Sequence, residues 1–292
     1  MPHTPVLLKE VIKFLDPKPG EFIIDGTVNG GGHAAEIIKK VSPKGKLLGV
    51  DWDEAILSGC RARFSGYENV ILVRGNYADL PEILRIKELG KADGLLLDLG
   101  FSTVQLDEGG KGFSFAKNEP LLMTYDADAK PVREVLKELG EKELAEIIFR
   151  FSGEKFAGRI AKAIKKQERL KPIETTAELR KIIESAVPGN YEHGRLEPST
   201  RTFQALRIYA NNELGNLEKI LNGLTRILKK GGRVVVISFH SLEDRVVKRA
   251  LRILEKNGQF KVLTKKPVVA GRNEVAQNPK SRSAKLRSAL IL

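Results

Sequence analysis

The chain has 292 residues, of which 41% are apolar and 30% charged, a composition of globular proteins rather than of fibrous or disordered ones. Its apolar runs are too short to span a membrane, and the first nine residues lack the pattern of a secretory signal, so we expect a cytoplasmic protein with no membrane partner. The one cysteine, Cys60, excludes an internal disulfide and suits a reducing compartment.

Positive charge is concentrated at the C-terminal end. Residues 1–199 contain 30 Lys and Arg against 31 Asp and Glu, whereas residues 200–292 contain 20 against 6. This local excess accounts for the formal net charge of +13 and makes nucleic acid the first partner to consider. A second basic stretch, residues 150–171, falls largely on one side of a predicted helix. The alternative for both stretches is a surface that only keeps the protein soluble.

Short apolar runs alternate with helical patterns over the first hundred residues. Helices are expected at 34–41, 55–64 and 80–89. The apolar runs predict the intervening strands, at 22–25, 47–51, 70–73 and 95–99. This alternation predicts an α/β fold with a parallel sheet, helices on both faces, and ligand binding outside the carboxyl ends of the strands.

Helical patterns then replace the strand signal until residue 234. A polar, glycine-rich stretch at 107–118 precedes Leu144, Ile147, Ile148 and Phe151, which repeat at helical spacing. The remaining expected elements are helices at 177–187, 203–228 and 242–254 and strands at 234–237, 260–263 and 286–292. We therefore expect a discontinuous sheet domain, 1–106 with 200–292, and a helical insertion domain at 107–199.

Acidic residues and a glycine-rich turn mark the strand ends. Residues 25–33 read DGTVNGGGH, in which the glycines permit close approach of a ligand and the following helix start offers free N–H groups. Asp51 ends the second strand, twenty residues past Gly31, where a carboxylate can accept both hydroxyls of a ribose. Asp98 ends the fourth strand. An ordinary turn and a helix cap are the alternatives. Three acidic strand ends at one edge, Asp25, Asp51 and Asp98, nevertheless favour a ligand site.

The turn does not spell G-x-G-x-x-G, which disfavours a dinucleotide and its pyrophosphate. A ligand with one nucleoside and a charged tail fits better, and S-adenosylmethionine has that shape. Two histidines, His33 and His240, are candidate general bases, although capping or packing is the more common role of a lone histidine. No spacing of Cys and His indicates a metal site.

Several long strings together resemble the bacterial family of 16S ribosomal RNA (cytosine-N4)-methyltransferases. The resemblance extends from HTPVLL at 3–8 to NPKSRSAKLR at 278–287, essentially the whole chain. Between these ends the strings that carry it are DGTVNGGGH at 25–33, GFSF at 112–115, TFQALRIY at 202–209 and GGRVVVISFHSLEDR at 231–245.

The resemblance implies methyl transfer from S-adenosylmethionine to the N4 of a cytidine in the decoding region of 16S rRNA, in the small ribosomal subunit. It also implies a class I, Rossmann-like methyltransferase sheet interrupted by a helical domain after the fourth strand. The cofactor positions that it implies are Gly31, Gly32, His33, Asp51, Tyr77, Asp98 and Gln105. Asp98 is also the candidate catalytic acceptor of a hydrogen bond from N4, with a backbone carbonyl of Leu99 and Gly100 as the alternative. Phe101 and Phe113 are candidate stacking partners for the base, and packing in the core is the equal alternative for them.

The sequence departs from the family pattern at a few positions. Asn29 replaces a usual glycine and tolerates a left-handed backbone. Leu122 and Thr124 stand where an Asp and an Arg are expected, which bears on substrate positioning. Lys280 replaces an arginine. Two other functions remain open at this point: a nucleotide-dependent oxidoreductase, and a non-catalytic factor that binds ribosomal subunits.

Overall fold

A computed structural model describes residues 5–100, 110–126, 128–191 and 197–292. It divides into two compact units, residues 1–102 with 214–292 and residues 103–213. We describe each unit by itself. None of the helices in the described ranges is long and apolar enough to cross a membrane.

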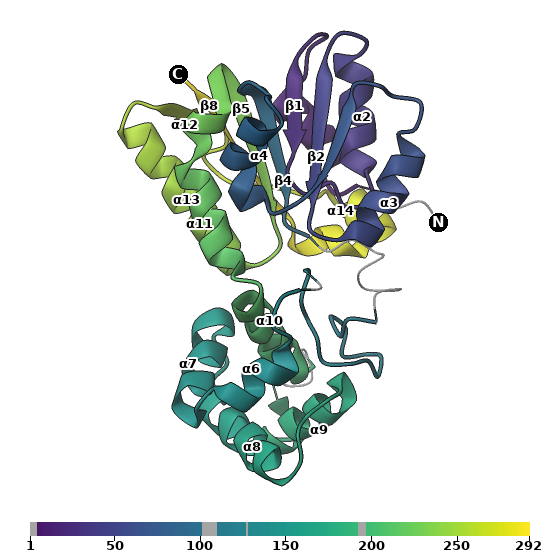
Figure 1. Cartoon of the computed structure of the whole chain (residues 1–292). Helices are drawn as coiled ribbons and strands as arrows, with labels where there is room; N and C mark the ends of the chain where they lie inside the picture. The colour runs from purple at the N-terminus through teal and green to yellow at the C-terminus, as the bar shows by residue number, and fades with distance from the viewer. Residues whose placement is uncertain (1–4, 101–109, 127, 192–196) are drawn as a thin grey trace. The chain divides into compact units, whose positions relative to one another are not determined.

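The first unit is built on one eight-stranded sheet within the described residues (Figure 1). Its strand order is β3-β2-β1-β4-β5-β8-β6, with β7 paired to β8. Strands β1 to β5 are parallel, and β8 runs antiparallel to β5, β6 and β7. The strands are β1 (Phe22–Asp25), β2 (Lys46–Asp51), β3 (Val70–Arg74), β4 (Ala92–Asp98), β5 (Leu228–Ser238), β6 (Phe260–Val262), β7 (Val268–Val269) and β8 (Lys285–Ile291).

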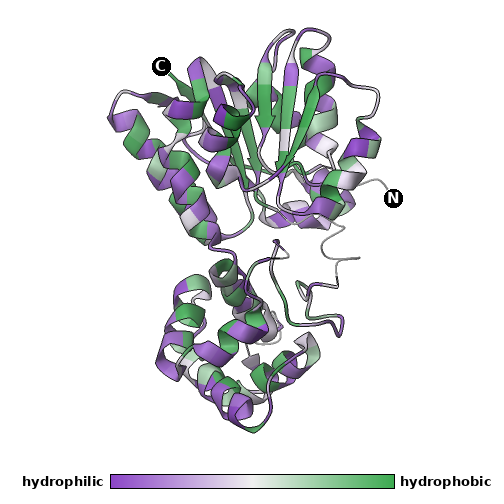
Figure 2. Ribbon diagram, in the orientation of Figure 1, coloured by the Kyte–Doolittle hydropathy of each residue, from purple (hydrophilic) through white to green (hydrophobic). Residues whose placement is uncertain are grey.

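Helices cover both faces of this sheet because its strand residues alternate between two apolar cores. Ile24 contributes to one core and its neighbour Ile23 to the other. The first face carries α4 (Leu80–Ile86), α11 (Glu213–Asn222), α12 (Leu224–Ile227) and α13 (Ser241–Lys256). The second carries α1 (Leu8–Leu15), α2 (Gly32–Val41) and α3 (Glu54–Arg63). Figure 2 shows the central strands as mainly hydrophobic, as strands covered on both faces should be. The short elements are η1 (Tyr77–Asp79), α14 (Arg272–Gln277) and η3 (Pro279–Ser283).

The second unit is helical. Its helices are α6 (Val132–Glu138), α7 (Glu141–Ser152), α8 (Ala157–Leu170), α9 (Thr176–Ala186) and α10 (Ser199–Ala210). Leu144 and Ile148 bury one face of α7, and Thr175 caps α9 by accepting a hydrogen bond from the backbone N–H of Glu178. The rings of Phe203 and Phe115 meet edge to face with centroids 5.5 Å apart, which joins α10 to this unit.

The predicted α/β fold class is confirmed: a Rossmann-like sheet with helices on both faces is interrupted after β4 by helices. The long helix expected at 203–228 is wrong, because the chain breaks there into α10, α11 and α12. The first break lies at Asn211 and Asn212, the second of which has a left-handed φ of 47°. The compact units divide at 213, and α10 therefore groups with the helical unit rather than with the sheet.

Candidate active site

Three buried aspartates end neighbouring parallel strands at one edge of the sheet. Asp25 ends β1, Asp51 ends β2 and Asp98 ends β4, and their exposed fractions are 1%, 7% and 5%. Because β1 pairs with both β2 and β4 in parallel register, the three carboxyl groups lie at the same edge. The sequence prediction of a common acidic edge is confirmed.

The turn between β1 and α2 lies at that edge and packs closely against Phe64 and Pro5. Gly31 has a left-handed φ of 73°, and a Cβ there would lie 2.9 Å from the Phe64 ring. A Cβ on Gly32 would lie 2.6 Å from the Pro5 ring. The guanidinium of Arg63 donates to the carbonyl of Gly30 at 2.8 Å and fixes the turn from the α3 side. Both glycines are thus held in place by packing.

Asn29 connects two of the aspartates. It has the left-handed backbone expected from sequence, with φ 48°. Its N–H donates to Asp51 Oδ2 at 3.0 Å, and its side-chain Nδ2 donates weakly to the Asp98 carbonyl at 3.4 Å. The residue that departs from the family pattern therefore keeps the turn geometry and adds a link to β4.

Asp51 is held by backbone donors but retains lone pairs for a ligand. Besides the Asn29 bond, its Oδ1 accepts from the N–H of Asp53 at 3.0 Å. Burial raises the pKa of Asp51 to about 6, and the nearby charge of Asp53 adds to the rise, whereas the backbone hydrogen bonds oppose it. Each carboxylate oxygen can accept a second hydrogen bond, so both hydroxyls of a ribose can be accommodated.

Asp25 lies deepest in the acidic edge. Burial raises its pKa to about 8, and the charges of Asp98 and Asp51 add to the rise, whereas a hydrogen bond from the N–H of Thr27 opposes it. The Thr27 hydroxyl in turn accepts from the N–H of Asp98 at 2.6 Å, which ties β1 to the end of β4. A cationic ligand would relieve the repulsion among these carboxyl groups.

His33 stands beside Asp98. Its Nε2 lies 2.9 Å from the carbonyl of Val6, which can only accept, so this nitrogen carries a proton. Its Nδ1 lies 3.6 Å from Asp98 Oδ2. The two side chains therefore lie next to each other at the acidic edge.

The remaining predicted site residues have different surroundings. Tyr77, after β3, is only 8% exposed and packs in the core of the α4 face. Gln105 and Phe101 lie outside the described residues. In the helical unit, Phe113 is 8% exposed and stacks on Tyr125, with ring centroids 5.1 Å apart. The ring of Tyr77 therefore lies largely in the protein interior.

The segment around Leu122, where the sequence departs from the family pattern, is a buried turn of the helical unit. Thr124 is 5% exposed, and Met123 has a left-handed φ of 55°. Asn211 holds the turn at two points: its Nδ2 donates to the Met123 carbonyl at 2.8 Å, and its Oδ1 accepts from the N–H of Tyr125 at 2.9 Å. This clamp explains why the helix stops at Asn211, and Thr124 is well packed without the expected charge.

Two residues that sequence leaves ambiguous have structural roles. His240 is the N-cap of α13, where its Nδ1 accepts from the N–H of Glu243 at 3.4 Å, so the capping interpretation is confirmed. Cys60 is buried in α3 and its thiol donates to the Asn29 carbonyl at 3.2 Å. Burial raises the pKa of that thiol to about 12, which keeps it protonated and unreactive.

Sequence reasoning missed Thr27 and Arg63 as supports of the site. The hydroxyl of Thr27 reaches β4, and the guanidinium of Arg63 reaches the turn from 33 residues away in sequence. The DGT run was a signal for Thr27, because a hydroxyl two residues past a strand end can reach the neighbouring strand. No local pattern identifies Arg63.

Known proteins are similar to this chain over nearly its whole length. The chain matches the MraW methylase family over residues 1–291. The "Ribosomal RNA small subunit methyltransferase H" of Syntrophus aciditrophicus is 44% identical, covering 98% of this chain and 96% of that protein. Proteins of the same name from Geotalea daltonii and Thermotoga neapolitana are 45% and 44% identical, covering 98% and 99% of this chain and 97% and 96% of their own lengths. The chain belongs to the MraW methylase family.

Proposed function

We propose that this protein transfers a methyl group from S-adenosylmethionine to the exocyclic N4 of a cytidine in the decoding region of 16S rRNA, within the small ribosomal subunit in the cytoplasm. The observation that carries the proposal is the acidic edge formed by Asp25, Asp51 and Asp98 in a chain of the MraW methylase family. S-adenosylmethionine, when bound, supplies an electrophilic methyl group on a positively charged sulfonium.

The residues present fit this cofactor. Burial is the main cause of the raised pKa values of Asp25 and Asp51, and the charges of nearby carboxylates add to it, which is a sign of repulsion among the ionised carboxyl groups. A ligand with a sulfonium and an ammonium group relieves it, and a dinucleotide with its pyrophosphate would increase the repulsion. Asp51 is assigned to the ribose hydroxyls, and the turn at Gly31, Gly32 and His33 to the amino-acid end. Tyr77 and Gln105 are assigned to the adenosine side and the covering segment.

Asp98 is the proposed catalytic residue. The lone pair of a cytosine amine is conjugated into the ring, so the amine becomes a better nucleophile when an acceptor takes a hydrogen bond from it as nitrogen becomes tetrahedral. Asp98 stands at the strand end where this acceptor is needed. We assign to the Nδ1 of His33, 3.6 Å from the Asp98 carboxylate, a share of the proton that leaves N4. His33 acts through Asp98 and is therefore a positioning residue.

The test is transfer of tritium from labelled S-adenosylmethionine to small ribosomal subunits that lack the modification, followed by identification of the labelled nucleoside. Wild type should produce N4-methylcytidine. Asp98→Asn, which keeps the shape but accepts a hydrogen bond less strongly, should lower the rate by about 10²- to 10⁴-fold. S-adenosylhomocysteine binding, measured in parallel, separates loss of chemistry from loss of cofactor.

Transfer by Asp98→Asn at the wild-type rate would contradict the role of Asp98. No transfer by wild type, despite binding of both cofactor and subunits, would contradict the proposed reaction and favour a non-catalytic factor. The sequence feature that favours such a factor is the absence of the expected charged pair at Leu122 and Thr124. A variant with Leu122→Asp and Thr124→Arg would then be the first to examine for restored transfer.

A further inference from the structure

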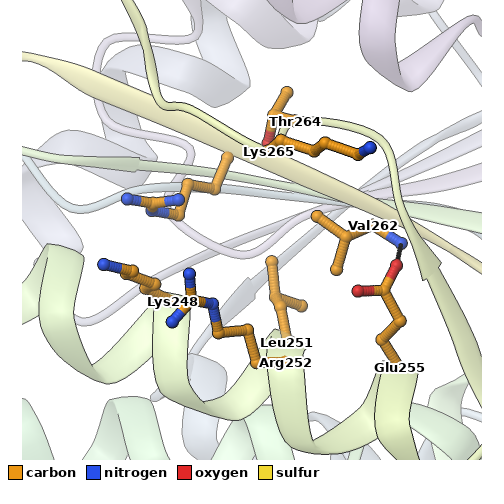
Figure 3. A pocket seen from close by; sticks show the side chains of 8 residues that line it. Lys248, Leu251, Arg252, Glu255, Val262, Thr264 and Lys265 are labelled. Carbon is orange, nitrogen blue, oxygen red and sulfur yellow. Dashed lines mark hydrogen bonds between the residues drawn. The ribbon is translucent and has the colours of Figure 1, made fainter.

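A basic pocket lies on the sheet unit, between α13 and the strands β6 and β8 (Figure 3). Its volume is about 260 Å³. The lining side chains come from three places in the chain: α13, β6 with the residues after it, and β8. They are Lys248, Leu251, Arg252, Glu255, Val262, Thr264, Lys265 and Arg287.

Positive charge in this pocket exceeds negative charge. Within the described residues, no carboxylate pairs with Lys248, Arg252 or Lys265. The one acidic lining residue, Glu255, directs Oε1 to the backbone N–H of Val262 at 2.9 Å. Figure 3 shows the head groups of Lys248 and Arg252 extending to the same side of the pocket, and the amine of Lys265 pointing away from them. Two adjacent cations that are in no ion pair suit an anionic ligand.

Arg287 has a different role from Lys248 and Arg252. It is 6% exposed, and its Nε and one terminal nitrogen donate to the two oxygens of Asp244 at 2.6 and 3.3 Å. This ion pair joins β8 to α13 and forms one wall of the pocket. Arg287 therefore positions the helix, whereas Lys248 and Arg252 are the groups available to a ligand.

The surface around the pocket is also basic. Further exposed cations lie on α13, in β6 and after it, and none is in an ion pair in the part of the chain that the structure describes: Arg245, Arg249, Lys256, Lys261 and Lys266. Along α13 these and the two pocket cations are spaced three or four residues apart, where like charges destabilise a helix by about 0.2–0.5 kcal/mol per pair. On other helices of this unit some exposed cations are paired, as Arg61 is with Glu54 and Arg85 with Glu82. A polyanion on α13 would remove the repulsion.

One wall of the pocket lies a short distance from the end of β4, where the proposed catalytic residue Asp98 stands. Arg287 of β8 is opposite Val236 of β5, and Val236 is opposite Leu97 of β4, the residue before Asp98. Two strand spacings of about 4.8 Å therefore place this wall about 10 Å to the side of the Asp98 strand end. A few nucleotides of single-stranded RNA span such a distance.

We propose that this pocket binds a backbone phosphate of the substrate RNA, a few nucleotides from the target cytidine, through Lys248 and Arg252. The inference rests on the proposed function, since it assigns a second contact to the same substrate. Such a contact fixes the register of the strand and carries no base specificity.

The experiment compares wild type with the double variant Lys248→Gln, Arg252→Gln. A matched control, Lys39→Gln with Arg85→Gln, removes two exposed cations from other helices of the same unit and changes the net charge equally. The affinity for unmodified small subunits is measured between 50 and 200 mM salt. For each phosphate contact removed, the fold loss of affinity over this range should shrink about threefold. The control should behave as wild type, and binding of S-adenosylhomocysteine should be the same for all three.

Equal salt dependence in the pocket variant and the control would overturn the proposal. Inorganic phosphate is the second probe. If it binds in the pocket but leaves subunit binding unaffected, the pocket takes free phosphate and the RNA assignment is wrong. Thermal unfolding of both variants checks that the fold is retained. Failure of the proposed function would be seen separately, as absence of methyl transfer by wild type.

Discussion

Lowering the pH from 7 to 5 should weaken the binding of S-adenosylhomocysteine about tenfold. The reason is the pKa of Asp51, which burial raises to about 6. Only the ionised carboxylate accepts hydrogen bonds from both ribose hydroxyls, because a protonated one must donate from one oxygen. With a pKa of about 6, the ionised fraction falls from about nine-tenths at pH 7 to about one-tenth at pH 5, which corresponds to about 1.4 kcal/mol of binding free energy.

The assay is isothermal titration calorimetry of the wild type at several pH values from 5 to 7. Asp51→Asn should bind more weakly and show no slope across this range. Asp25→Asn is the internal control: the pKa of Asp25 is raised to about 8, so its carboxyl group is mostly protonated throughout and its removal should leave the slope in place. A constant wild-type affinity, or an unchanged slope in Asp51→Asn, would refute the assignment of Asp51 to the ribose.

Three further predictions concern the stability of the site. The pKa of Asp25 in the folded protein is raised from 3.8 to about 8, so its contribution to stability is complete below pH 4 and is lost as the pH rises to 8. Asp25→Asn should reduce this loss by on the order of 5 kcal/mol at most. Urea unfolding at pH 5 and 8.5 that shows the same loss of stability in both proteins would contradict this prediction. Gly31 has a φ of 73°, so Gly31→Ala should destabilise the protein by about 1–2 kcal/mol and weaken cofactor binding. The Cβ of Gly30→Ala would meet nothing within 4 Å, so this variant should be near neutral in the same unfolding and titration measurements. Thr27→Val removes the acceptor of the Asp98 N–H and should destabilise by about 1–3 kcal/mol, while Thr27→Ser should restore most of that stability; equal unfolding curves for the two variants would count against the hydroxyl.

The sheet and its acidic edge were predictable because they depend on local patterns. Each of β1, β2 and β4 is a short apolar run that ends in an aspartate, and parallel pairing brings the three carboxyl groups to one edge. Period and composition are enough for such an inference.

The helix break at Asn211 was not predictable, because it depends on a contact between distant residues. The apolar period continues through this position, but the Asn211 side chain is needed to clamp the turn at Met123, 88 residues earlier in the chain. The sequence also could not distinguish Arg287 from the exposed cations beside it. Its partner, Asp244, becomes a neighbour only when β8 adds to the sheet next to α13.

Strand β4 pairs with β5, which begins at Leu228, so the two central partners are separated by the entire helical unit. During synthesis at about 5–20 residues per second, β4 waits on the order of ten seconds before its partner emerges. For that interval one side of an apolar strand is an open edge that could pair with another chain. The nascent protein is therefore most prone to aggregate after Asp25, Asp51 and Asp98 have been made and before β5 exists, and a helical unit that folds promptly shortens the effective distance that β5 must close.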